Sequence, residues 1–119
     1  MANFEREQVV LNRLESKGTT NDLTGDTVIV TWTATMAHGS LLDASDAEVD
    51  LAGIAGAVKV IDCAPIGVYD YAVGDSVAVN VAEKGCVFNL DSLKTSDRGA
   101  VTEAALTGLA GNLNSFRTL

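Results

Sequence analysis

Polar and hydrophobic residues alternate in two stretches of this chain, 27–33 and 75–81, and this period of two predicts a half-buried β-strand in each. A Gly-Asp pair opens both stretches, which is common turn usage. Each strand is expected to turn its apolar face toward the core of a β-sheet. The apolar faces consist of Val28, Val30 and Trp32 in the first stretch and of Val77, Val79 and Val81 in the second.

The residues that follow the second strand predict a hairpin. Glu83-Lys84-Gly85 has the composition of a tight turn, because glycine readily adopts the positive φ that such a turn needs. The apolar run 86–90 is then expected to return as the antiparallel partner of 75–81. A hairpin alone is marginally stable in water, so the remaining apolar runs are expected to complete a sheet.

Residues 100–113 predict a C-terminal helix, because apolar residues recur there at a spacing of four. Ser96 or Asp97 is the expected cap. Gly108 and Gly111 weaken the helix by about 1 kcal/mol each relative to alanine, so it should be short or held by packing. Its apolar face would contain Val101, Ala105, Leu109 and Leu113.

The first 26 residues are polar and mixed in charge, and we expect an extended N-terminal arm (1–26) ahead of a β domain with a C-terminal helical segment (27–119). The apolar residues of the arm fit either a short helical stripe or an extended segment, and the sequence leaves both open. These residues are Val9, Val10, Leu11 and Leu14.

Composition limits both the size of the core and the class of partner. A chain of 119 residues forms one domain, and with 47% hydrophobic but only 5% aromatic residues its core must be mainly aliphatic and modest. Additional stabilisation by a partner surface is therefore expected. The formal net charge of −8 argues against binding to nucleic acid or to an anionic membrane, because both require clustered Lys and Arg.

Residues that commonly carry chemistry are sparse. Cys63 and Cys86 are separated by 23 positions and the chain has a single histidine, His38, which excludes the usual zinc spacings. We expect reduced, buried thiols, with a disulfide between neighbouring strands as the alternative. The first residues lack the features of a secretion signal, and no apolar run approaches the roughly 20 residues of a membrane span, so a soluble protein is expected.

Three further groups of residues have the types found in binding or catalytic sites, but a structural role explains each group more simply. The acidic segment 43–50 lacks the spacing of a calcium loop and predicts a solvated strand face. His38 is expected at a surface turn beside Gly39, with no nucleophile motif near it in the sequence. Trp32, Tyr69 and Tyr71 are expected to pack rather than to stack a ligand. No catalytic residue, metal site or cofactor is predicted, and the protein is not expected to be an enzyme.

The order of these segments, over about two-thirds of the chain, resembles the head decoration proteins of bacteriophage lambda and its relatives, which stabilise capsids. The resemblance extends from Ala34 to Asn114. The segments that carry it are Ala34–Asp43, Ala64–Val68, Val77–Val81, Gly85–Phe88, Leu90–Leu93 and Ala105–Asn112.

This resemblance implies a mainly β fold with short helices (α+β), of the bent-ribbon or β-clip type. It also implies a homotrimer on the outer surface of an expanded icosahedral phage head, bound to the major capsid protein at three-fold positions. The protein would be made in the host cytoplasm and end in the virion. Residues expected to contact the capsid are Val9, Val10, Leu11 and Leu14 in the arm, and His38, Leu41 and Leu42 in the domain.

A function of another class is also compatible with the sequence. Val73-Gly-Asp-Ser-Val77 resembles the Gly-Asp entry into a strand of biotinyl and lipoyl carrier domains, and Lys84 lies on the predicted hairpin, where such domains carry the modified lysine. The residues beside Lys84 differ from the Met or Asp-Lys-Ala context of those domains. We therefore treat the carrier domain as the alternative.

Overall fold

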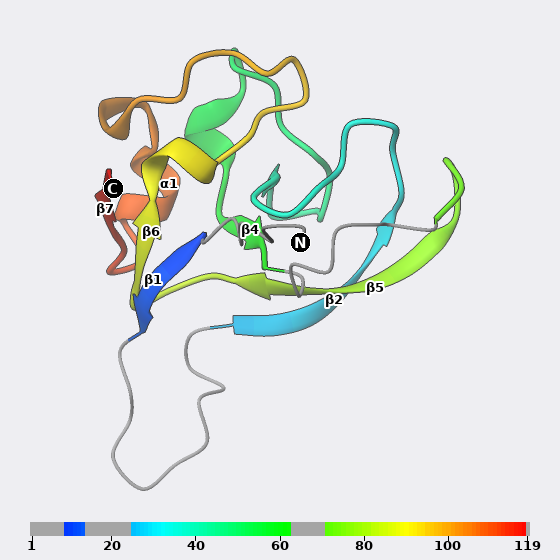
Figure 1. Ribbon diagram of the computed structural model, residues 1–119, viewed down its shortest axis with the longest axis horizontal. Helices are drawn as coiled ribbons and strands as arrows, with labels where there is room; N and C mark the ends of the chain where they lie inside the picture. Colours follow the sequence, from blue (N-terminus) through cyan, green and yellow to red (C-terminus); the bar gives the residue numbers. More distant parts are fainter. Residues whose placement is uncertain (1–8, 14–24, 63–70, 119) are drawn as a thin grey trace, which may run out of the picture.

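Two β-sheets with short helical turns make up the protein in a computed structural model that describes residues 9–13, 25–62 and 71–118 (Figure 1). This mainly β architecture confirms the predicted fold class. One sheet has the strand order β2-β5-β4-β3 and the other β1-β6-β7. The strands are β1 Val10–Arg13, β2 Gly25–Thr31, β3 Leu41–Leu42, β4 Lys59–Ile61, β5 Ser76–Ala82, β6 Cys86–Asn89 and β7 Ser115–Arg117. The short helices are η1 Ile54–Gly56, η2 Leu90–Ser92, η3 Glu103–Ala105 and α1 Thr107–Ala110.

The two strands predicted from alternation, β2 and β5, pair with each other. They run antiparallel in continuous register from Gly25↔Ala82 to Thr31↔Ser76 and form the long curved ribbon along the lower side of Figure 1. Their alternating valines are buried, with Val28 only partly so, whereas Ile29 on the opposite face is 64% exposed. The sequence pattern therefore predicted both the strands and the side chains that face the core.

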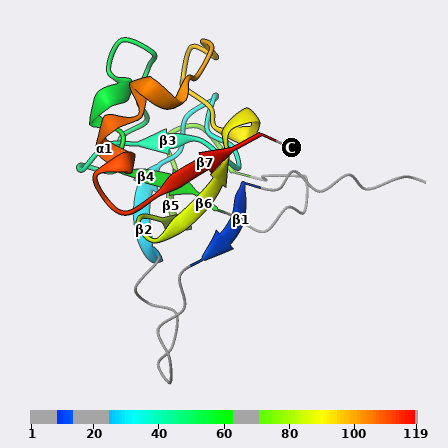
Figure 2. The same ribbon diagram turned by 90° about the vertical axis from the view of Figure 1, so that its left-hand side faces the viewer.

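The predicted hairpin between 75–81 and 86–90 is wrong. β5 pairs with β2 along one edge and with β4 along the other, so no edge remains for β6. Gly85 does have a positive φ of 68°, as the turn required. The turn leads into the second sheet, however, where β6 lies between antiparallel β1 and parallel β7 (Figure 2).

Consecutive residues of β3, β4 and β5 turn to opposite faces and fill two separate cores. Leu41 and Val60 belong to the core that also contains Phe88, whereas their neighbours Leu42 and Ile61 belong to the core around Trp32. This part of the four-stranded sheet is therefore covered on both faces. The β2–β5 ribbon extends beyond it and has a core on only one face.

Gly39 joins the beginning of β3 to the chain that follows η2. Its N–H donates to the Ile61 carbonyl (2.8 Å) and its carbonyl accepts from the Lys94 N–H (2.9 Å). The residue has a φ of +94°, and a Cβ built there would lie 2.0 Å from the Ser92 carbonyl oxygen. Only glycine satisfies both the backbone conformation and this close approach.

The predicted helix over 100–113 is also wrong. The structure has only the single turns η3 and α1 in this segment, and Leu113 is exposed with a φ of 62°. Gly108 lies so close to η1 that a Cβ there would meet the Ala57 and Ala55 carbonyl oxygens at 2.6 and 2.7 Å. This approach buries Leu106 and Leu109, so tertiary packing determines the path of the segment more than helix propensity does.

Of the two alternatives for the N-terminal apolar residues, the extended one is observed. β1 pairs with β6, with an irregularity between Val10 and Asn12, and the side chain of Val9 is buried in the Phe88 core. Residues 9–13 are thus part of the folded domain, whereas the sequence predicted that they belong to an arm separate from it. Residues 1–8 and 14–24 lie outside the description.

Gly39 and Gly74 have similar positive φ values, so replacing each by alanine distinguishes the cost of a steric clash from the cost of the backbone conformation. Gly39→Ala should lower the free energy of unfolding by about 2 to 4 kcal/mol, because the new Cβ would collide with the Ser92 carbonyl. Gly74→Ala has the same unfavourable φ but no atom within 4 Å of the new Cβ, and should cost about 1 kcal/mol. Urea unfolding of both variants measures the difference; equal losses would show that the close approach does not constrain the fold.

Candidate interaction surface

Most of the residues predicted to contact a capsid lie inside the protein. Leu41 and Leu42 are completely buried and Val9 is 1% exposed, so their side chains stabilise this chain and offer no surface to a partner. This corrects the prediction for these three residues. Val10 and Leu11 of β1 are half-buried and remain accessible in part, and Leu14 lies outside the described residues.

His38 is buried, which differs from the surface position expected for it. Its carbonyl accepts a hydrogen bond from the Lys94 ammonium (2.8 Å), which also donates to the Ser92 carbonyl (3.2 Å). Lys94 therefore spans the same junction that Gly39 forms through its main chain. The 38–42 segment has a structural role in this fold.

Among the large apolar side chains of the described residues, three are more than half exposed. Ile29 lies on the open face of the β2–β5 ribbon, Val73 is 69% exposed beside Gly74, and Leu113 is 79% exposed before β7. Gly74 has a φ of 95°, so Val73 belongs to a tight turn that presents its side chain outward. Single exposed apolar side chains are normal on protein surfaces, but each of these three would gain free energy if a partner buried it, which makes them candidates for contact residues.

Leu113 is held outward by its neighbour. The buried amide of Asn114 accepts from the Cys86 N–H (3.0 Å) and donates to the carbonyls of Glu83 (2.8 Å) and Leu109 (2.9 Å). These bonds fix the backbone around Leu113 in the left-handed region, which is unfavourable for leucine. An exposed leucine in a strained conformation is a candidate contact residue. Sequence analysis assigned it to a helix face, and no signal in the sequence indicated its exposure.

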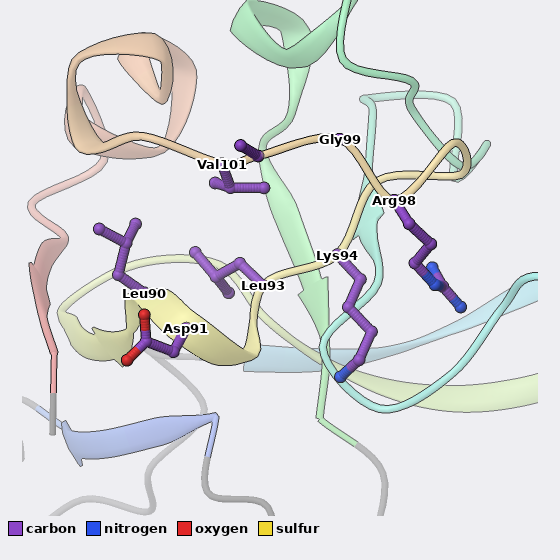
Figure 3. Close-up of a pocket in the computed structure, with 8 residues that line it drawn as sticks. Leu90, Asp91, Leu93, Lys94, Arg98, Gly99 and Val101 are labelled. Carbon is purple, nitrogen blue, oxygen red and sulfur yellow. The ribbon is translucent and has the colours of Figure 1, made fainter.

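A hollow of about 370 Å³, lined by both apolar and charged residues, lies between η2 and the segment 98–101 (Figure 3). Leu90, Leu93 and Val101 point into it from both sides, whereas Lys94 and Arg98 extend away (Figure 3). The hollow is large enough for one side chain of a partner, whose apolar part would contact Leu90, Leu93 and Val101.

Asp97 shapes the loop beside this hollow. Its carboxylate accepts from the Thr95 hydroxyl (2.7 Å) and from the N–H groups of Gly99 (3.3 Å) and Leu51 (3.2 Å). The hydrogen bond from Thr95 is the largest cause of a lowered pKa for Asp97, from an ordinary value of 3.8. The carboxylate thus fixes a loop; it does not cap the helix that the sequence predicted.

The acidic segment 43–50 is a turn, and the predicted solvated strand face is wrong. Asp43 accepts from the N–H groups of Ser45 and Ala47, and Asp46 has a positive φ of 63° and forms an ion pair with Lys59. The Glu48 carboxylate accepts from the hydroxyls of Thr33 and Thr35, at 2.7 Å each. Within 9–13, 25–62 and 71–118, no group of three or more His, Cys, Asp or Glu side chains is arranged to hold a metal ion.

The remaining sequence predictions have simple outcomes. Trp32 is buried and Tyr71 packs against it edge-on with ring centroids 5.0 Å apart, as expected of packing aromatics. Tyr69 and Cys63 lie outside the described residues, so the redox state expected for Cys63 and the buried Cys86 stays a prediction. None of the helices in the described ranges has the length and apolar character needed to cross a bilayer.

The lowered pKa of Asp97 predicts a specific pH dependence. A depressed folded-state pKa contributes stability above the unfolded value of 3.8, and that contribution is lost as the pH falls through the folded-state value. Asp97→Asn should therefore be less stable than the parent at pH 6, and the difference should shrink below pH 3.8. Urea unfolding over this pH range measures the difference; a gap that stays constant would mean that the carboxylate charge is not involved.

Comparison with known proteins adds no relative to this picture. No family model, no curated protein and no solved structure matches the chain. The function must therefore be argued from the surface that the fold presents.

Proposed function

We propose that this protein is a structural virion protein that decorates and stabilises an icosahedral phage head. It binds the major capsid protein on the outer surface of the expanded shell, as a homotrimer at three-fold positions. The observation that carries the proposal is the outward display of Val73 and Leu113 on tight turns, together with the sequence resemblance to decoration proteins.

The surface chemistry supports binding to a protein partner. In the described residues the most exposed large apolar groups are Ile29, Val73 and Leu113, and the hollow adds the side chains of Leu90, Leu93 and Val101. Contacts of this kind depend on shape and apolar burial, which suits a protein whose work is to join copies of another protein. The half-buried Val10 and Leu11 in the edge strand β1 are a further contact region in this proposal.

A cyclic trimer fits the modest size of the two cores. The Phe88 core is built mainly from leucine, valine and alanine and the Trp32 core is half valine, so burial of additional apolar surface between copies would stabilise the fold appreciably. In a cyclic trimer, one surface contacts a different surface of the next copy. Leu113 and the leucine and valine side chains of the hollow are two different surfaces that would form an apolar contact between copies.

The alternative carrier function has less support. Lys84 is exposed, as modification requires, but it lies where the chain passes from one sheet to the other. β5 and β6 are not paired, so Lys84 does not occupy the tip of a hairpin between partner strands.

Leu113→Asn should weaken binding to the shell without lowering the free energy of unfolding of the protein. Asparagine tolerates the left-handed conformation better than leucine, so the free energy of unfolding should stay constant or rise by up to about 1 kcal/mol. Loss of the leucine side chain, worth about 1.5 to 3 kcal/mol on burial, should weaken binding to expanded shells about tenfold or more. Cosedimentation with shells of the capsid protein from the same virus measures binding.

Ala104→Asn is the matched control, because Ala104 is an exposed residue of η3 with no large apolar group to lose. It should leave shell binding unchanged. Failure of the parent protein to bind expanded shells would overturn the proposed function, and equal binding of parent and Leu113→Asn would remove Leu113 from the contact.

Intact-mass measurement distinguishes the two proposed classes. Protein purified from its native host should have the mass of the unmodified chain, because the decoration role needs no prosthetic group. An added biotinyl or lipoyl group that disappears in Lys84→Arg would favour the carrier function and contradict the capsid role.

A further inference from the structure

β2 presents an open edge in the described part of the chain. In the four-stranded sheet it is the outermost strand, and β5 occupies only one of its sides. The segment 27–31, Thr-Val-Ile-Val-Thr, contains no charge and no proline, although charges and prolines are the usual means of blocking such an edge. This edge is therefore suited to pairing with another strand.

The hydrogen bonds of the ribbon show which main-chain groups face outward. The Trp32 N–H donates to the Asp75 carbonyl (2.8 Å) and the Trp32 carbonyl accepts from the Gly74 N–H (2.8 Å). Alternate residues of a strand direct their main-chain groups to opposite sides, so Val28 and Val30 face β5 as Trp32 does. The N–H and C=O groups of Thr27, Ile29 and Thr31 consequently point to the open edge.

A side-chain contact agrees with this assignment. The Thr27 hydroxyl donates to the amide oxygen of Asn80, its register partner on β5, at 2.9 Å. Close side chains of this kind are typical of antiparallel pairs that exchange no main-chain hydrogen bonds. The outward Thr27 N–H donates to the Asp26 carboxylate (2.7 Å), a local bond that an incoming strand would replace.

We propose that β2 pairs antiparallel with β2 of a second copy, about a two-fold axis at Ile29. The segment 27–31 reads the same in both directions, so this register places threonine opposite threonine, valine opposite valine and isoleucine opposite isoleucine. Such β-branched pairs are favourable across strands. Asp26, the one charged residue of β2, lies opposite Trp32, so no like charges face each other.

The pairing uses the main-chain groups that β5 leaves open. Ile29 exchanges both of its hydrogen bonds with Ile29 of the second copy, and Thr27 and Thr31 do so with each other. Stable dimers bury about 1,200 Å² or more, and the edge of one seven-residue strand covers less, so the association is weak in solution. The inference rests on β2 alone and is independent of the proposed capsid role.

The test follows amide exchange in the full-length protein from about 10 μM to about 1 mM, a range suited to weak association. The N–H groups of Ile29 and Thr31 should become protected as the concentration rises, and the average mass from sedimentation should increase. A concentration-independent exchange rate together with an unchanged mass would overturn the proposal. Protection of both groups already at the lowest concentration, without association, would also overturn it, because the edge would be covered within one chain.

Charged variants test the edge and its register. Ile29→Lys should abolish association, because it opposes two like charges across the axis. Ala78→Lys places the same charge on the same exposed face, because Ala78 pairs with Ile29 in the register but lies on β5, away from the edge. This variant should weaken the association of two copies much less. Equal effects of the two variants would assign the contact to the sheet face and overturn edge pairing.

A pair of double variants tests the register directly. Thr27→Lys with Thr31→Lys should abolish association, whereas Thr27→Glu with Thr31→Lys should restore it, since residue 27 of one copy lies opposite residue 31 of the other. Identical behaviour of the two double variants would overturn the two-fold axis at Ile29. All four altered residues are exposed, and thermal unfolding checks that every variant is folded.

Discussion

The close approach of Gly39 to the chain after η2 is the constraint on which the rest of the structure depends. The main chain of 39–41 bonds to Ile61 on one side and to Lys94 on the other, so it joins the four-stranded sheet to the segment that follows the three-stranded one. Leu41 and Leu42 then enter different cores because they are consecutive residues of one short strand. A side chain at position 39 would separate these contacts, and both cores would lose their common boundary.

The pattern of hydrophobic and polar residues was sufficient to predict a strand where one face of that strand is buried and the other is exposed. Val77, Val79 and Val81 alternate with exposed residues in β5, and the period of two identified both the strand and its inner face. The same pattern did not predict which strands pair with β5. Glu83–Gly85 has turn composition whichever sheet the next strand joins, and β5 already has neighbours on both edges.

Features that depend on tertiary contacts were missed. The apolar spacing in 100–113 is compatible with a helix, but the contact of Gly108 with the carbonyls of η1 and the hydrogen bonds of Asn114 impose a different path. Leu41 and Leu42 were predicted as surface contacts because a sequence does not reveal that a two-residue strand lies between two cores. The exposure of Leu113 was not predicted for the same reason, since the buried side-chain amide of Asn114 fixes its conformation.

The order in which the strands pair has a consequence for the synthesis of the chain. β1 has no partner until β6 exists, since Val10 pairs with Phe88, and the core they share is completed by Leu106 and Leu109 still later in the sequence. Contacts between residues so far apart form slowly, because a long loop must close before they gain any stability. The ribosome must therefore synthesise the chain beyond Leu109 before this core can be completed. Until then the residues that precede β6 and face this core, such as Val60 and Ala82, are exposed to other nascent chains.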